Sequence, residues 1–318
     1  MEPNPSLLSV MELNGWVSRA QRVAGSLIVL CDNKPMFMPH GDAVEFGNVV
    51  PPVYSLHQMG KKILALCLGG VYRVENFKEA FAAKGARHWR MFRLEFAERL
   101  SLEEESGFLI AGHMHDHEKD DWVTQLALHD QRGDFIQFVG TRLRNFKLRG
   151  LQIIGRPNPV GEETPLVVIF GNDSAFYIEL DRIGEGTQVQ WTHFANHRDL
   201  HDVCQCWTTG SGDRRKFDLW AATEHGLKCW DWGRYTWSNV EPGAFYSLYP
   251  KKDERGREHL FAAAENGLYC VPERDWMFEW EELRRPAAFV DLREGMFLAR
   301  VDRKSRKSTL EPLFHPEH

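Results

Sequence analysis

The sequence contains no apolar run long enough to cross a membrane, and its longest apolar segments, residues 63–68 and 166–170, have the length of strands. The first residues, Met-Glu-Pro-Asn-Pro, show no basic stretch followed by a long apolar one, so no secretory signal is expected. Cysteine is scarce, with six residues in the chain, and most lie in strand-like runs where a free thiol behaves as a small buried side chain. These features predict a cytoplasmic protein with reduced cysteines.

Motifs of several catalytic and cofactor-binding classes are missing as well. The chain has no Gly-x-Ser-x-Gly nucleophile elbow, no Gly-x-Gly-x-x-Gly loop, no Walker-type phosphate loop and no sialidase-type Asp-box. The formal net charge is -6, which is opposite in sign to the charge of a protein that grips nucleic acid over a broad basic surface. We therefore expect no cofactor and no catalytic activity.

The informative pattern that is present is an internal repeat. Residues 218–231 align with residues 259–272 without a gap, at an offset of about 41 positions, which is within the range of propeller repeats. Identical pairs include Leu219 and Leu260, Ala221 and Ala262, Glu224 and Glu265, Gly226 and Gly267, Leu227 and Leu268, and Cys229 and Cys270.

Each copy of the repeat reads as a β-hairpin. A short apolar run is followed by a turn and a second apolar run, and runs of this length are typical of strands. The turns Glu224-His225-Gly226 and Glu265-Asn266-Gly267 suit a tight connection, because Gly and Asn accept positive φ. Five weaker copies of the pattern lie at residues 27–38, 63–74, 108–128, 166–178 and 296–314.

Seven hairpins in 318 residues give a spacing of about 45 residues, that of four-stranded propeller blades. Because strand-like segments flank most hairpins, we predict an all-β chain forming one seven-bladed β-propeller domain over residues 1–318, each blade a four-stranded antiparallel sheet. The last unit lacks a strand, and residues 6–13 supply a spare one, so we expect this N-terminal segment to pair with the seventh blade and close the ring. The predicted blades span residues 16–50, 53–92, 94–140, 142–194, 200–241, 243–284 and 286–315.

The strongest repeat, Leu-Trp-Ala-Ala-Thr-Glu-His-Gly-Leu at residues 219–227, resembles the repeat of two-component-regulator-type seven-bladed propellers. That repeat has an apolar-aromatic strand, a Thr-Glu-Asn-Gly-like turn and a Gly-Leu pair leading the next strand; Ala221 and Ala262 stand where the family usually has Gly. Gly-Gly-Val-Tyr at residues 69–72 weakly resembles a kelch repeat, and the paired signatures of WD40 repeats are not in register. The resemblance implies a propeller fold and no particular activity, because propellers carry many functions.

One helix and one set of aromatic residues complete the expected architecture. Residues 76–85 begin with Asn76, carry Glu79 three residues later and end with Gly85, the start and stop signals of a two-turn helix in a loop. Of eleven tryptophans, seven lie between residues 207 and 280. We expect these wide rings to fill the space between adjacent sheets.

The sharpest polar cluster follows residue 112 and contains His113, His115, Asp116 and His117. These residue types ligate Zn²⁺, and on an extended segment the three histidines would share one face. The run approaches the His-x-His-x-Asp-His signature of metallo-β-lactamase-type hydrolases, but one residue is missing before the Asp. A metal site also needs converging ligands and supporting partners. We therefore interpret the segment as a solvated hairpin tip and expect no bound metal.

Two other clusters have a structural interpretation. Cys204 and Cys206 would point the same way on a strand and could form a two-thiolate clip, but no second pair has the spacing of a structural metal site, so core packing is favoured. The second cluster consists of His193, His197, Asp199, His201 and Asp202. These residues could occupy one face of a short connecting helix, or they could lie in a polar loop between blades.

Basic residues gather in two places. In one of them, basic and apolar residues alternate, which predicts a strand with one basic face for an acidic partner or an RNA backbone. Its basic residues are Arg142, Arg144, Lys147 and Arg149. The other place, residues 300–307, predicts a charged hairpin turn that keeps a sheet edge from pairing. For both, a solvated face is the alternative without a binding role.

The function predicted from these features is a non-catalytic scaffold, adaptor or regulatory subunit whose loops dock another protein. One alternative is an enzyme or ligand-binding protein with a site at the axial channel, assisted by a metal held through residues 113–117. A weaker alternative is binding of RNA or an acidic partner through Arg142, Arg144, Lys147 and Arg149.

Overall fold

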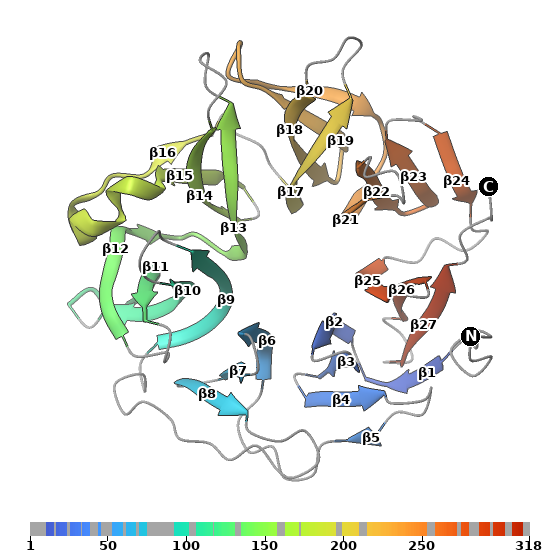
Figure 1. Cartoon of the computed structure of the whole chain (residues 1–318), viewed down its shortest axis with the longest axis horizontal. Coiled ribbons are helices and arrows are strands. Elements are labelled where there is room, and N and C mark those ends of the chain that lie inside the picture. Colours follow the sequence, from blue (N-terminus) through green and yellow to red (C-terminus); the bar gives the residue numbers. More distant parts are fainter. Residues whose placement is uncertain are drawn as a thin grey trace. The chain divides into compact units, whose positions relative to one another are not determined.

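The structure is a computed structural model of the chain, shown in Figure 1. Its strands belong to two compact units, one formed by Met1–Leu94 with Leu283–His318 and the other by Glu95–Glu282. The residues that it describes are 11–15, 17–23, 26–32, 34–38, 44–45, 53–59, 62–67, 70–74, 92–101, 106–116, 118–130, 135–157, 163–171, 173–194, 199–209, 215–252, 258–271, 275–279, 286–292, 295–302 and 307–313.

The first unit contains three antiparallel sheets within its described residues. One sheet has the strands β2 (Val17–Val23), β3 (Ser26–Cys31), β4 (Lys34–Met38) and β5 (Val44–Glu45). The next has β6 (Val53–Met59), β7 (Lys62–Cys67) and β8 (Gly70–Val74). The third, in the order β1-β27-β26-β25, has β1 (Met11–Asn14), β25 (Pro286–Leu292), β26 (Gly295–Asp302) and β27 (Lys307–Leu313).

The N-terminal strand completes the C-terminal sheet, which confirms the predicted pairing for residues 11–13, whereas residues 6–10 of the predicted segment lie outside the described residues. β1 runs antiparallel to β27, with Met11 opposite Leu310 and Leu13 opposite Ser308. Leu13 is buried, so this short strand contributes to the core as well as to the sheet. The number of blades and the closure of the ring stay predictions.

The second unit contains four sheets of four antiparallel strands, each in chain order from first to last. The first of them has β9 (Phe92–Ser101), β10 (Ser106–Asp116), β11 (Asp121–His129) and β12 (Phe135–Arg144). The next has β13 (Leu148–Pro157), β14 (Glu163–Gly171), β15 (Ala175–Glu179) and β16 (Thr192–His193). Then follow β17 (Leu200–Thr209), β18 (Arg215–Thr223), β19 (Gly226–Asp231) and β20 (Thr236–Glu241). The last has β21 (Phe245–Lys252), β22 (Glu258–Ala264), β23 (Gly267–Val271) and β24 (Asp275–Glu279).

The sequence repeat corresponds to equivalent hairpins. β18 pairs with β19 so that Ala222 lies opposite Leu227, and β22 pairs with β23 so that Ala263 lies opposite Leu268. In the first turn the Thr223 hydroxyl donates to the Gly226 carbonyl at 2.8 Å. The predicted hairpins are therefore confirmed, and repeated residues occupy repeated places.

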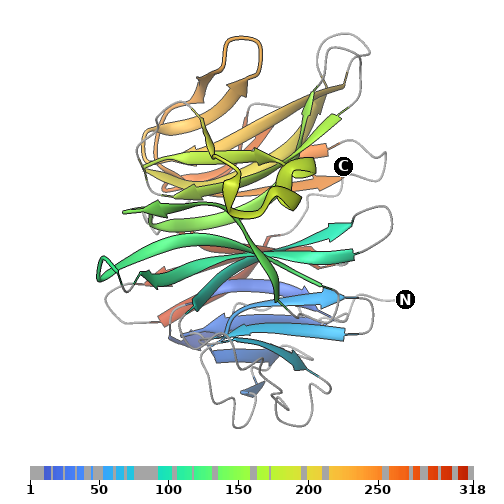
Figure 2. The same ribbon diagram turned by 90° about the vertical axis from the view of Figure 1, so that its left-hand side faces the viewer.

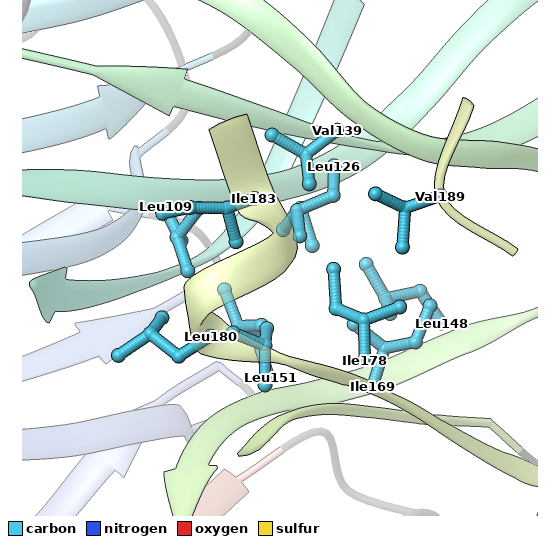
Figure 3. Packing of buried hydrophobic residues seen from close by; sticks show 12 residues of the cluster. Leu109, Leu126, Val139, Leu148, Leu151, Ile169, Ile178, Leu180, Ile183 and Val189 are labelled. Atoms are coloured by element: carbon cyan, nitrogen blue, oxygen red, sulfur yellow. The ribbon is translucent and has the colours of Figure 1, made fainter. Parts of the chain in front are cut away.

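Apolar side chains join neighbouring sheets of the second unit. One cluster lies between the β9–β12 and β13–β16 sheets, and Figure 3 shows Leu109, Leu126, Leu151 and Ile169 pointing toward one another within it. The predicted packing of tryptophans between sheets is confirmed for those whose side chains are described. Trp220 packs in the cluster formed with β21–β23, and Trp230, Trp232 and Trp237 pack in the cluster formed with β13–β15.

A 3-10 helix, η3 (Leu180–Gln188), which the sequence did not predict, lies between β15 and β16. It lies beside β12 in Figures 1 and 2, and covers that edge strand. The Thr141 N–H donates to the Val189 carbonyl at 3.0 Å, and the Trp191 indole donates to the Thr141 carbonyl at 2.8 Å. Gly140 lets the Trp191 ring approach, because a Cβ there would lie 2.8 Å from the ring.

Two further findings concern helices. The helix expected at residues 76–85 lies outside the described residues. In the part of the chain that the structure describes, no helix combines the length and the apolar character that spanning a membrane requires.

Candidate functional site

The predicted His-rich and Arg-rich segments meet at one end of the β9–β12 sheet. β10 continues to Asp116 and pairs with β11 up to the Asp116–Asp121 pair, so the polar turn predicted from residue 113 is wrong for His113 to Asp116. β11 in turn places Val123 opposite Arg144, the last residue of β12. The turn is short because strand pairing depends on backbone hydrogen bonds, which polar side chains do not prevent.

The two faces of this strand end carry different side chains. Leu109 and Ala111 belong to the cluster that faces the β13–β16 sheet, and by alternation His113 and His115 continue that side of β10. Asp116 lies on the opposite side. The shared face predicted for the histidines is present for His113 and His115, whereas His117 lies outside the described residues. Within the described part of the chain, no three His, Cys, Asp or Glu side chains are grouped as a metal would require.

His113 is tied into the connection to the next sheet through a threonine. The Thr124 hydroxyl donates to the Phe146 carbonyl at 2.8 Å and lies 3.1 Å from Nδ1 of His113. Because the single hydroxyl proton is used toward Phe146, the hydroxyl accepts from His113, which places a proton on Nδ1. His113 is therefore a positioned hydrogen-bond donor within the fold.

His115 supports an exposed tryptophan. Its Nε2 atom lies 3.3 Å from Oδ1 of Asp120, in the turn. Its ring meets the Trp122 ring edge-on, with centroids 5.5 Å apart and an interplanar angle of 78°. The Trp122 side chain is 52% exposed. The histidine thus fixes one side of a large aromatic ring whose other surface faces solvent.

Asp116 holds two arginines on the other face. Its Oδ2 atom accepts from Nη2 of Arg144 at 2.6 Å and lies 3.7 Å from Nη1 of Arg142. Its Oδ1 atom accepts from the Glu118 N–H at 3.2 Å. Burial alone would raise the pKa of Asp116, but the Glu118 N–H and the two guanidinium groups outweigh it, so the pKa lies below its usual value. Asp116 is 4% exposed, while the side chains of Arg142 and Arg144 are 49% and 36% exposed.

The single basic strand predicted for this region is wrong. β12 ends at Arg144, Asn145 takes a left-handed conformation with φ of 54°, and β13 begins in the next sheet. Asn accepts this conformation more readily than most residues, because its short polar side chain can bond locally. Arg142 and Arg144 therefore share one face of β12, whereas Lys147 lies in the connection and Arg149 in β13.

The second His group is held by strands and not by a helix. His193 lies in β16 and His201 in β17, while His197 lies outside the described residues. His201 Nε2 lies 2.7 Å from Oε2 of Glu224 in the repeat turn. Asp202 accepts the Val203 and Leu248 N–H groups at 2.9 and 2.8 Å, and so links β17 to β21. His225 Nε2 lies 3.6 Å from Oδ2 of Asp199 at the exposed end of the sheet.

A recurrent β-bulge was missed from the sequence. In six sheets of the described structure the first strand has one extra residue near its start, opposite the second strand. The extra residues in β17 and β21 are His201 and Tyr246, and the centroids of their rings lie 5.1 Å apart. A bulge changes the direction in which one side chain points. The sequence does not predict it, because a bulge alters the pairing of two strands without requiring a particular residue type. The other extra residues are Ser18, Tyr54, Arg149 and Ala287.

The two neighbouring cysteines pack in the core, as expected. Cys204 and Cys206 are both buried in the cluster between the third and fourth sheets of the second unit. Burial raises the pKa of Cys204 well above that of a free thiol, and raises that of Cys206 to about 12 with help from Glu258 and Asp218. Both thiols therefore stay protonated at neutral pH, which is the form that neither attacks nor ligates.

Comparison with known proteins identifies the fold. No family model matches the chain, and no curated protein matches it by sequence. Among solved structures, BBS1N in complex with ARL6DN, soaked with lead, superposes with a TM-score of 0.59 at 9% identity, covering 93% of this chain and 89% of that one. The Pan2 WD40 domain of Neurospora crassa gives 0.56 at 11% identity, covering 95% and 90%.

A third solved structure also matches most of the chain. The extracellular domain of the hybrid two component system BT4673 from B. thetaiotaomicron superposes with a TM-score of 0.50 at 10% identity, covering 95% of this chain and 39% of that one. Together with the four-stranded antiparallel sheets, these likenesses show a β-propeller fold.

Proposed function

We propose that this β-propeller chain is a non-catalytic scaffold that docks another protein at the end of the β9–β12 sheet. The observation that carries the proposal is the preorganisation of exposed Trp122, Arg142 and Arg144. His115 packs against the tryptophan ring, and buried Asp116 accepts a hydrogen bond from Arg144 and lies within ion-pair distance of Arg142. Trp and Arg are the residue types that dominate binding at protein interfaces, and fixing them before binding lowers the entropic cost of association.

The fold is consistent with such a role. BBS1N, which shares the fold, was crystallised in complex with another protein, ARL6DN. A stiff framework of sheets holds its connecting segments in place, and exposed side chains on that framework can meet a partner with little rearrangement. A cytoplasmic location remains a prediction.

The metal-assisted alternative finds less support in the site. It would need the side chains of His113, His115 and Asp116 to converge on one ion. Asp116 lies on the face opposite the histidines and is engaged by Arg144. His113 and His115 have contacts that explain their positions within the fold, to Thr124 and Asp120 respectively.

Affinity capture with the full chain tests the proposal. Wild type, Trp122→Ala and Tyr235→Ala are used as baits in host-cell extract; Tyr235 is 61% exposed and lies beside a different sheet, so it is the matched control. A protein recovered in stoichiometric amount with wild type and the control, and lost with Trp122→Ala, supports docking at this site once binding is reproduced with the purified partner. Equal recovery by all three baits places docking elsewhere, and recovery of no stoichiometric protein contradicts the scaffold function.

A further inference from the structure

We propose that Arg142 and Arg144, positioned by Asp116, bind a carboxylate side chain in an acidic segment of the partner protein. This inference rests on the proposed function and specifies the chemistry of the partner. It also assigns Asp116 a role as a positioning residue, which its place in the sequence does not suggest.

The charges at the site do not balance. Asp116 contributes one negative charge and contacts two guanidinium groups, so the trio carries a net charge of +1. Oδ2 accepts one hydrogen bond from Arg144, and Arg142 approaches the same oxygen only to 3.7 Å. Each guanidinium carries five N–H donors, so most donors of these half-exposed groups remain available to a ligand.

Holding the two arginines together has an electrostatic cost. They are two positions apart on β12 and therefore share a face, where like charges repel. Asp116 offsets this repulsion through an oxygen that lies within 4 Å of both groups. An arrangement that keeps two cations side by side with one anion is suited to receive a second anion, and the fork of an arginine matches the two oxygens of a carboxylate.

The surroundings favour a short acidic peptide over RNA. The adjacent turn carries Glu118 and Asp120, both exposed, and β11 begins directly after it with Asp121. These carboxylates would repel a continuous phosphate backbone, whereas a single inserted side chain avoids them. RNA binding also draws on many cationic contacts, and the break at Asn145 separates Arg142 and Arg144 from Arg149.

A peptide titration tests this inference directly. The probe is a fluorescein-labelled peptide of about 12 residues in which one central Glu is surrounded by Gly and Ser, and a peptide with Gln in place of that Glu is its control. Binding to the full chain is followed by fluorescence anisotropy. The Glu peptide is expected to bind at least about tenfold more tightly than the Gln peptide, and the difference is expected to shrink as salt rises from about 50 to about 300 mM.

Variants locate the binding. Arg142→Gln and Arg144→Gln are each expected to weaken binding of the Glu peptide about tenfold, whereas Arg182→Gln, an exposed arginine paired with Glu185 on η3, is expected to leave it unchanged. Arg142 is half exposed and forms no hydrogen bond within the described structure, so its variant is not expected to disturb folding.

Asp116→Asn separates positioning from charge. Removing this carboxylate raises the positive charge of the site, so a site that acted through charge alone would bind the Glu peptide more tightly. A positioning role predicts weaker binding, measured at a temperature where the variant is folded by circular dichroism. Tighter binding of the Glu peptide by Asp116→Asn would contradict the positioning role of Asp116.

The remaining outcomes are decisive in different ways. Equal affinity of wild type, Arg142→Gln and Arg144→Gln for the Glu peptide overturns the inference, as does tighter binding of a uridine oligonucleotide than of the Glu peptide. If the peptide does not bind but a partner is captured through Trp122, the inference fails and the scaffold function stands. If the peptide binds and no stoichiometric partner exists, the scaffold function fails while the carboxylate site stands.

Discussion

The Ser308 hydroxyl donates to the Gly15 carbonyl at 2.8 Å, across a sequence separation of 293 residues. The same oxygen accepts from the Val17 N–H at 3.0 Å. Ser308 is fully buried and Val17 is 2% exposed, so both bonds are shielded from water. One side chain therefore links the end of β1, the start of β2 and strand β27.

Ser308→Ala is expected to destabilise the protein by about 1–3 kcal/mol, because it leaves a buried donor and a buried acceptor without their partner. Unfolding in urea measures this difference. The matched control is Lys307→Ala at the neighbouring exposed position, where the Glu12 contact at 3.6 Å is worth about 1 kcal/mol or less. If both variants lost the same free energy of unfolding, the buried hydrogen bonds of Ser308 would contribute nothing to stability.

Asp116→Asn is expected to lower the melting temperature at pH 7, and the gap from wild type is expected to close in acid. The native pKa of Asp116 is below its unfolded value, so the ionised carboxylate stabilises the fold above the unfolded pKa, near pH 4. That contribution is lost as the pH falls through the native pKa. Thermal unfolding of both proteins across this pH range checks the direction of the effect. A difference in melting temperature that stays constant in acid would show that the ion pair with Arg144 is not its cause.

The hairpin turns could be predicted from the sequence because their chemistry is local. Gly226 follows two polar residues between apolar runs, and this order alone indicates a tight connection. The Asp116–Arg144 contact could not be found in the same way. It joins β10 to β12 across β11, and so depends on the register of three strands, which residue types in this segment do not determine.

The end of a strand was equally hard to predict where polar residues continue it. His113 to Asp116 look like a turn by composition, yet pairing with β11 extends β10 through them. Conversely, the alternation that runs past Arg144 looks like one strand, and only the left-handed Asn145 divides it. The 3-10 helix was missed for a related reason, since Gly184 and Gly186 are unfavourable in helices and typical of turns.

Gly226→Ala is expected to destabilise the repeat hairpin by about 1–3 kcal/mol. Gly226 has φ of 152°, and a Cβ at this position would lie 2.8 Å from the Glu241 carbonyl oxygen. Gly184→Ala is the control, because no atom lies within 4 Å of the Cβ it would add and its φ is not in the range that requires glycine. Urea unfolding of both variants measures the difference, and a neutral Gly226→Ala would show that the turn relaxes freely.

The aromatic cluster around Trp230 gives a test of packing without hydrogen bonding. Trp230 is 4% exposed, and its ring meets those of Phe194 and Trp237 at centroid distances of 5.0 and 5.2 Å. Its buried indole N–H has no hydrogen-bond acceptor among the described residues. The contribution of Trp230 to stability should therefore come from the ring and not from the N–H group.

Trp230→Phe is accordingly expected to cost less than about 1.5 kcal/mol, since it keeps most of the buried ring and removes a donor that gains nothing. Trp230→Ala is expected to cost about 3–5 kcal/mol, because it opens a large cavity between two sheets. Urea unfolding of the two variants, with Trp191→Phe as a reference that does lose a hydrogen bond at 2.8 Å, separates the contributions. If Trp230→Phe were as costly as Trp230→Ala, the indole N–H would have to bind a partner, and stability at this interface would depend on a polar contact rather than on aromatic packing.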